Sequence, residues 1–127
     1  MRGLLLGACF AFLAVGSAWA VEPQPYEAGA FAAAQAAGRP ILVDIHAPWC
    51  PICAAQAPTL ERLEHSAELG DLTVFSVDFD TEKDVVRGFG AQMQSTLIVF
   101  RGKAEKGRST GVTDPAAIKA LLLKSKA

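Results

Sequence analysis

The chain has 127 residues, the size of a single domain, with 12 Lys and Arg against 13 Asp and Glu and a formal net charge of −1. This balance lacks the basic footprint of nucleic-acid-binding proteins, so we expect no nucleic-acid partner. Three cysteines and two histidines are too few for a disulfide-stapled small protein or a four-cysteine zinc site.

The first twenty residues have the layout of a secretory signal peptide. Arg2 provides a basic start, residues 4–15 are almost wholly apolar, and Ala18-x-Ala20 offers the small residues that signal peptidase accepts. An uncleaved membrane anchor is the alternative, but the apolar run is shorter than the about 20 residues that span a bilayer. A lipoprotein signal at Cys9 is disfavoured because the apolar run continues past that cysteine.

We therefore predict cleavage near Ala20, which leaves residues 21–127 as one exported domain in the periplasm or outside the cell. The mature form is not expected to span a membrane. Cleavage also removes Cys9, so Cys50 and Cys53 are the only remaining cysteines, and they enter an oxidising compartment.

Four helices and four strands are predicted after a polar, extended leader at residues 22–25. In chain order they are a helix over Tyr26–Ala37, a strand over Ile41–His46, a helix from Cys50 to about Leu69, a strand over Leu72–Phe79, a helix from Thr81 to about Gly88, strands over Thr96–Phe100 and Ala104–Thr110, and a helix from Pro115 to about Lys124. Strands joined through helices pair in parallel by right-handed crossovers, whereas the final two form an antiparallel hairpin. The order predicts an α/β protein with a mixed sheet of about four strands.

Local signals fix several ends of these elements. Gly38 ends the first helix, Thr81 is predicted to cap the third, and Asp114 followed by Pro starts the last. Pro58 should kink or break the second helix. In that helix Leu60 and Leu63 form the apolar face, and the polar side chains, which we assign to the other face, are Glu61, Arg62, Glu64 and His65.

Charge is distributed unevenly along the chain. Residues 21–86 contain three basic and eleven acidic side chains, whereas residues 87–127 contain eight basic and two acidic ones. A basic docking face is one interpretation. We favour the other, in which Lys103, Lys106 and Arg108 prevent edge-to-edge pairing of the last strand.

The chemistry is concentrated in Cys50-Pro51-Ile52-Cys53, which follows a predicted buried strand and opens a helix. At a helix N-terminus the unpaired N–H groups and the helix dipole stabilise a thiolate. We predict that Cys50 is the exposed nucleophile and Cys53 the more buried resolving thiol. A static disulfide is the alternative, but so short a loop gives little stability, which favours redox chemistry.

A resemblance to the thioredoxin family lies in residues 41–53, ILVDIHAPWCPIC, and in Pro58 five residues later. It continues through residues 72–80 and 95–100 and covers nearly all of the chain from residue 40 onward. The resemblance implies a three-layer α/β/α sandwich and protein-disulfide oxidoreductase activity without a cofactor or metal. It also implies protein thiol or disulfide substrates, a membrane or periplasmic redox partner, and a monomer.

By the same resemblance, Asp44 lies beneath the cysteines and relays protons to Cys53, and Trp49 shields the Cys50 sulfur. Burial of a strand carboxylate raises its pKa, as a general base near neutrality requires. Substrate backbone is expected to pair with the loop at Gln94 and Ser95. The direction of electron transfer stays open between reductase and oxidase or isomerase.

Four departures from the family pattern affect these expectations. Ser95 aligns with the family's cis-proline, and a cis bond before a non-proline residue costs about 2.5–4 kcal/mol, so Gln94–Ser95 is expected to be trans. Pro51-Ile52 replaces Gly-Pro between the cysteines. Ser76 replaces a lysine near the buried aspartate, and the family's first strand is expected to be missing.

His46 leaves a second class of function open. With Cys50 and Cys53 it could bind a soft metal such as Cu(I), which would make the chain a metal-binding or delivery module. An ordinary hydrogen-bonded histidine at a strand end is the favoured interpretation. A third hypothesis is an adaptor that keeps the fold without redox activity.

Overall fold

The computed structural model describes residues 22–127, so the predicted signal peptide lies outside the described residues. In chain order the elements are β1 (Gln24–Pro25), α1 (Ala28–Ala36), β2 (Pro40–His46), α2 (Pro51–Glu64), β3 (Thr73–Asp78), α3 (Lys83–Gly88), β4 (Thr96–Arg101), β5 (Ala104–Thr110), α4 (Pro115–Leu123) and the 3₁₀ helix η1 (Lys124–Lys126). In this part of the chain no helix is both long and apolar enough to cross a bilayer.

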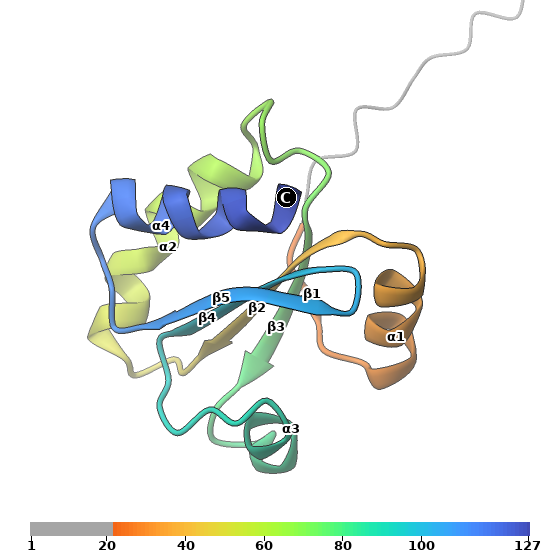
Figure 1. The fold of residues 1–127 in the computed structure, drawn as a ribbon. Helices are drawn as coiled ribbons and strands as arrows, with labels where there is room; N and C mark the ends of the chain where they lie inside the picture. Colours follow the sequence, from red (N-terminus) through yellow and green to blue (C-terminus); the bar gives the residue numbers. More distant parts are fainter. Residues whose placement is uncertain (1–21) are drawn as a thin grey trace, which may run out of the picture.

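The strands form one mixed sheet in the order β1-β3-β2-β4-β5. β3 pairs in parallel with both β1 and β2, whereas β4 is antiparallel to β2 and β5. Helices α2 and α4 cover one face of the sheet, and α1 and α3 lie on the opposite side (Figure 1). This is the predicted three-layer α/β/α arrangement, with the central strand β2 buried between the layers.

Strand side chains alternate between two hydrophobic cores. From β2, Leu42 points into the core under α2 and α4, whereas Ile41 and Val43 point into the core that also contains Phe31 and Phe89. Both faces of the central strands are therefore covered, which explains their nearly continuous apolar sequence.

The sheet has five strands rather than the four predicted, and the fifth is the short β1. Its two residues, Gln24 and Pro25, lie in parallel register with Phe75 and Ser76 at the edge of the sheet. Proline is tolerated at such an edge because no neighbouring strand needs its missing N–H. Because Gln24 and Pro25 are both exposed, they show no alternation of hydrophobic and polar residues. The sequence therefore predicted an extended leader but not its pairing with β3.

Three helix ends differ from prediction. α1 begins only at Ala28, because the carboxylate of Glu27 accepts hydrogen bonds from the N–H groups of Gly29 and Ala30 at 3.0 and 2.7 Å. α3 has Glu82 rather than Thr81 at its N-cap position. α2 passes through Pro58 as one helix but ends at Glu64, five residues before the predicted end.

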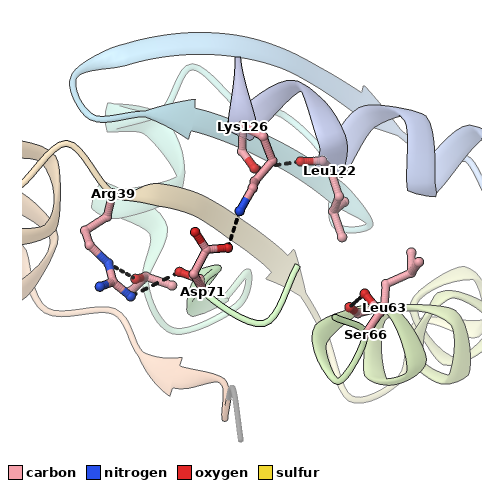
Figure 2. Close-up of polar contacts among 8 residues, drawn as sticks. Arg39, Leu63, Ser66, Asp71, Leu122 and Lys126 are labelled. Carbon is pink, nitrogen blue, oxygen red and sulfur yellow. Dashed lines mark hydrogen bonds and ion pairs between the residues drawn. The ribbon is translucent and has the colours of Figure 1, made fainter. Parts of the chain in front are cut away.

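Side chains hold the loop after α2 (Figure 2). The Leu63 carbonyl accepts from the Ser66 N–H at 3.0 Å and from the Ser66 hydroxyl at 2.6 Å. Further along, the Arg39 guanidinium donates to the Asp71 carbonyl at 3.0 Å, and Lys126 of η1 bonds to the Asp71 carboxylate. The loop is thus tied to the chain before β2 and to the C-terminal 3₁₀ helix.

The position of β5 agrees with the favoured interpretation of the basic segment. β5 lies at the outer edge of the sheet, where its basic side chains oppose pairing with another strand. Two lysines of the basic half also pair with carboxylates of the acidic half, namely Lys119 with Glu68 and Lys126 with Asp71.

Candidate redox site

The two cysteines lie where β2 passes through a short turn into α2. Cys50 is the N-cap residue of α2, and its sulfur accepts a hydrogen bond from the Cys53 N–H at 3.1 Å. Pro51 occupies the first turn of the helix, where its missing N–H is not needed. The predicted placement of the pair at a helix N-terminus is therefore confirmed.

The relative exposure of the cysteines is opposite to the prediction. Cys50 is only 3% exposed, whereas Cys53 is partly exposed. The reason is the capping bond, which turns the Cys50 sulfur toward the first turn of α2. Both residues line one surface pocket of about 290 Å³, which we call the redox pocket. Both are free thiols, so this is the dithiol form.

Cys53 is a thiol that resists ionisation. Burial and a hydrogen bond with the Cys50 thiol raise the pKa of Cys53 to about 11, although backbone hydrogen bonds at Ala47 and Ser95 partly lower it. At neutral pH this group carries a proton, so attack by its sulfur requires a proton acceptor nearby.

Asp44 is a carboxylate of the same pocket. It lies in the middle of β2, lines the redox pocket together with both cysteines, and is paired in register with Ser76 of β3. Burial raises the pKa of the Asp44 carboxyl, and the charge of His46 opposes that shift. The predicted grouping of Asp44 with Cys50 and Cys53 in one pocket is thus present.

His46 does not form a metal site with the cysteines. Its Nδ1 lies 3.2 Å from the Ser76 hydroxyl, the arrangement of an ordinary hydrogen-bonded histidine at a strand end. Among residues 22–127, no group of three or more His, Cys, Asp or Glu side chains comes together to hold a metal ion.

In the described part of the chain three large hydrophobic side chains are exposed, and two of them, Trp49 and Ile52, adjoin the cysteines in the sequence. Trp49 is 59% exposed, and its Nε1 donates to the Asp80 carboxylate at 2.6 Å, so the ring is held in place while most of it faces solvent. Ile52 and Met93 are also large, exposed hydrophobic side chains. Asp80 was not predicted as a site residue, since it lies in a loop without a motif.

The Ser95 loop approaches the site from the start of β4. No peptide bond in residues 22–127 is cis, so Gln94–Ser95 is trans, as predicted. Ser95 is buried, with a φ of 59°, in the left-handed region that non-glycine residues rarely adopt. Its backbone hydrogen bond to Cys53 is one that proline could not make. Gln94 is partly buried beside it.

Gln56 is a structural partner of this loop that the sequence motifs did not indicate. The side chain is 1% exposed, and its amide donates to the carbonyls of Ser95 and Val112 at 3.4 and 2.9 Å. The Ser95 carbonyl also accepts from the Gly111 N–H at 3.0 Å. α2 therefore fixes the loop that faces its own first turn.

Glu64 is likewise not where the sequence pattern placed it. We predicted it on the solvent face of the helix, but it is only 4% exposed. Its position four residues after Leu60 explains this, because positions i and i+4 share one helix face.

Similarity to known proteins agrees with this geometry. The thioredoxin family profile matches residues 24–124. The thioredoxin of Chlamydia muridarum is 36% identical over 84 residues, which cover 66% of this chain and 80% of that protein. The bifunctional thioredoxin reductase/thioredoxin of Mycobacterium leprae is 35% identical over 92 residues, which cover 72% of this chain but 20% of that protein.

A solved structure shares most of this fold. Trxlp from Edwardsiella tarda EIB202 superposes with a TM-score of 0.75 at 45% identity, covering 77% of this chain and 95% of that one. The protein disulfide-isomerase tigA of Aspergillus niger is 42% identical over 71 residues, 54% of this chain and 20% of that protein.

A CxxC pair at the mouth of a helix, on a mixed sheet covered by helices on both faces, defines a protein thiol–disulfide oxidoreductase. The chain belongs to the thioredoxin family, whose members act on protein thiols and disulfides.

Proposed function

We propose that this protein is an exported, monomeric thiol–disulfide oxidoreductase that works in the periplasm or outside the cell. The observation that carries the chemistry is the capping geometry, with the Cys50 sulfur 3.1 Å from the Cys53 nitrogen and Asp44 in the same pocket. The basic, apolar and small-residue segments of residues 1–20 support export.

In the proposed reaction, the Cys50 thiolate attacks a substrate disulfide and forms a mixed disulfide, releasing one substrate thiolate. Asp44 then takes the proton of Cys53, and the resulting thiolate attacks the Cys50 sulfur. This step forms the Cys50–Cys53 disulfide and releases the second substrate thiolate. Two electrons pass to the substrate, and a redox partner must return them.

Substrate binding is proposed for the surface beside the cysteines. Trp49 offers an exposed apolar ring, and the backbone at Gln94 and Ser95 lies close enough to Cys53 to meet an extended peptide. Because Ser95 replaces proline and adopts a positive φ, this peptide pairing differs from that of family members with proline there.

Cysteine variants test the proposed chemistry. Cys50→Ser should abolish reduction of insulin disulfides, whereas Cys53→Ser should retain the first attack and accumulate a mixed disulfide that a nonreducing gel detects. Insulin reduction by Cys50→Ser at the wild-type rate would overturn the proposal.

The reduction potential tests the direction. We infer the reducing direction, because thioredoxins are among the relatives that cover most of their own length and Cys53 is a protonated thiol. Equilibration with glutathione should then give a potential of about −270 mV, the value of thioredoxin. A value of about −120 mV, that of a strong periplasmic oxidant, would instead assign an oxidase.

Export is tested by the N-terminal sequence of the protein recovered from its native host. A chain that begins at Val21 supports cleavage after Ala20. A chain that begins at Met1 and stays in the cytoplasm would contradict the proposed location.

A further inference from the structure

Two surface pockets meet at Asp44. The redox pocket lies on one side of it, and a second pocket of about 370 Å³, which we call the acidic pocket, lies on the other. The lining residues that the two pockets share are Pro23, Asp44, Ala57 and Leu60. Asp44 is thus the one carboxylate that faces both the cysteines and the acidic pocket.

The second carboxylate of this arrangement is Glu64, which lines the acidic pocket. Cys53, Ala57, Leu60 and Glu64 are separated by four, three and four residues, so they form one stripe along α2. The stripe spans about 16 Å of helix axis. All four residues line one or both of the pockets, which places Cys53 and Glu64 at the two ends with Asp44 opposite the middle.

The ionised form of Glu64 is energetically unfavourable in this buried position. It is 4% exposed, and none of the ion pairs formed within residues 22–127 involves it. A buried carboxylate without a cationic partner is destabilising and marks a candidate functional group. Burial, and then the charge of Asp44, raise the pKa of Glu64 to about 7.

We propose that Glu64 is the outer member of a two-carboxylate proton relay, which connects Asp44 to solvent through water in the acidic pocket. This inference rests on the proposed role of Asp44. In the relay, the Cys53 thiol gives its proton to the Asp44 carboxylate, and the thiolate attacks the Cys50 sulfur of the mixed disulfide. Asp44 then passes the proton to the Glu64 carboxylate, which releases it to solvent.

The groups around Glu64 support a path that ends in solvent. Glu61 and His65 of the α2 end and Glu22 of the N-terminal segment line the outer part of the acidic pocket, and Glu22 and His65 lie 4.0 Å apart as an exposed pair. The charge of His65 lowers the pKa of Glu64, whereas Asp44, Glu22 and Glu61 raise it. On the β3 side of Asp44 the residue in register is the uncharged Ser76.

The relay is tested by separating the two thiol steps. An aromatic disulfide, 5,5′-dithiobis(2-nitrobenzoate), reacts with Cys50 and releases one coloured thiolate, and a second is released when Cys53 attacks the mixed disulfide. The rate of that second, unimolecular phase is measured between pH 5.5 and 9 in the wild type and in Glu64→Gln.

In the wild type we expect the second-phase rate to rise through an inflection near pH 7, as Glu64 becomes able to accept a proton. Glu64→Gln should lose this inflection and slow the second phase roughly threefold or more above pH 7, less than the about 100-fold loss of a general base. The first phase should not change. Glu61→Gln is the matched control, since it removes an exposed carboxylate of the same pocket and should keep the inflection.

A further variant separates failure of the relay from failure of the proposed function. If Asp44→Asn slows the second phase but Glu64→Gln follows the wild-type pH profile, the relay is wrong and the role of Asp44 stands. If the second phase of Asp44→Asn proceeds at the wild-type rate, Asp44 is not the base, and the proposed relay is wrong as well. Thermal unfolding of each variant establishes that the fold is intact.

Discussion

Ser95 is the one non-glycine residue of the described part of the chain, residues 22–127, that has a positive φ. A φ of 59° costs a non-glycine residue roughly 1–2 kcal/mol, because Cβ approaches the following carbonyl oxygen. The surrounding hydrogen bonds hold that conformation, since Gln56 and the Gly111 N–H both bond to the Ser95 carbonyl. Strain of this kind concentrates where function determines backbone position.

Ser95→Gly should therefore stabilise the protein by about 1 kcal/mol, because glycine adopts a positive φ without steric cost. Chemical denaturation measures the free energy of unfolding. The matched control is Ser109→Gly in β5, where glycine weakens a strand and should lower that free energy. A glycine variant at position 95 that is less stable than the wild type would contradict the strain argument.

Whether a polar residue is buried is the property that sequence patterns predicted least well. Cys50 and Cys53 were predicted together because their motif places them at a helix start, and the family resemblance implied that Asp44 lies beneath them. The burial of Gln56 and Glu64 depends on loops and pockets far away in the chain, so a helical pattern alone placed Glu64 in solvent. The exposures of the two cysteines were reversed because a capping bond decides them.

Among the elements, α2 links the cysteines to the rest of the site. Its N-terminus holds the CxxC pair, its buried face carries the stripe toward Asp44, and Gln56 ties it to the loops before β4 and α4. A single helix therefore determines the position of both thiols, of the Ser95 loop and of the candidate relay.

Gln56→Leu should destabilise the protein by about 1–3 kcal/mol, because leucine fills a similar volume but leaves the Val112 carbonyl without its donor. The same variant should alter the pH dependence of Cys53 alkylation, since the Ser95 backbone bonds to that thiol. Gln92→Leu is an exposed control that should change neither property. Unchanged stability in the Gln56 variant would show that the loop does not depend on this bond.

Elements with a regular pattern were predicted closely, and those without one were not. β5 has the predicted bounds, and β2 and β4 each differ by one residue, because their apolar or charged runs end at Gly, Pro or turn residues. α2 ends early, at Glu64 with His65 as its C-cap, and both the N–H and the hydroxyl of Ser66 bond to the Leu63 carbonyl just beyond that end. β1 is defined only by its pairing with β3, a tertiary contact.

At the scale of the whole molecule, the buried carboxylates set how stability depends on pH. The pKa of Glu64 is raised to about 7, above the about 4.3 of an unfolded chain, and the pKa of Asp44 is raised as well. At these two groups the folded protein therefore binds more protons than the unfolded one. The resulting stability is present below the unfolded pKa values and is lost as pH rises through 7.

We expect the free energy of unfolding of the wild type to be higher at pH 5.5 than at pH 8. Glu64→Gln should reduce this difference by about 1–2 kcal/mol after allowance for solvent screening. Urea denaturation at a series of pH values measures the effect. Glu61→Gln should retain the wild-type slope, because this carboxylate is exposed. A Glu64→Gln slope equal to that of the wild type would show that Glu64 ionises freely in the folded state.

Trp49 gives the molecule a built-in optical probe. The full sequence contains two tryptophans, Trp19 and Trp49, and the first lies in the predicted signal peptide. After cleavage near Ala20, all indole emission comes from a ring that adjoins Cys50 and is held by Asp80. Changes at the cysteine pair can then be followed by the fluorescence of the unlabelled protein, without a reporter group that would disturb the pocket.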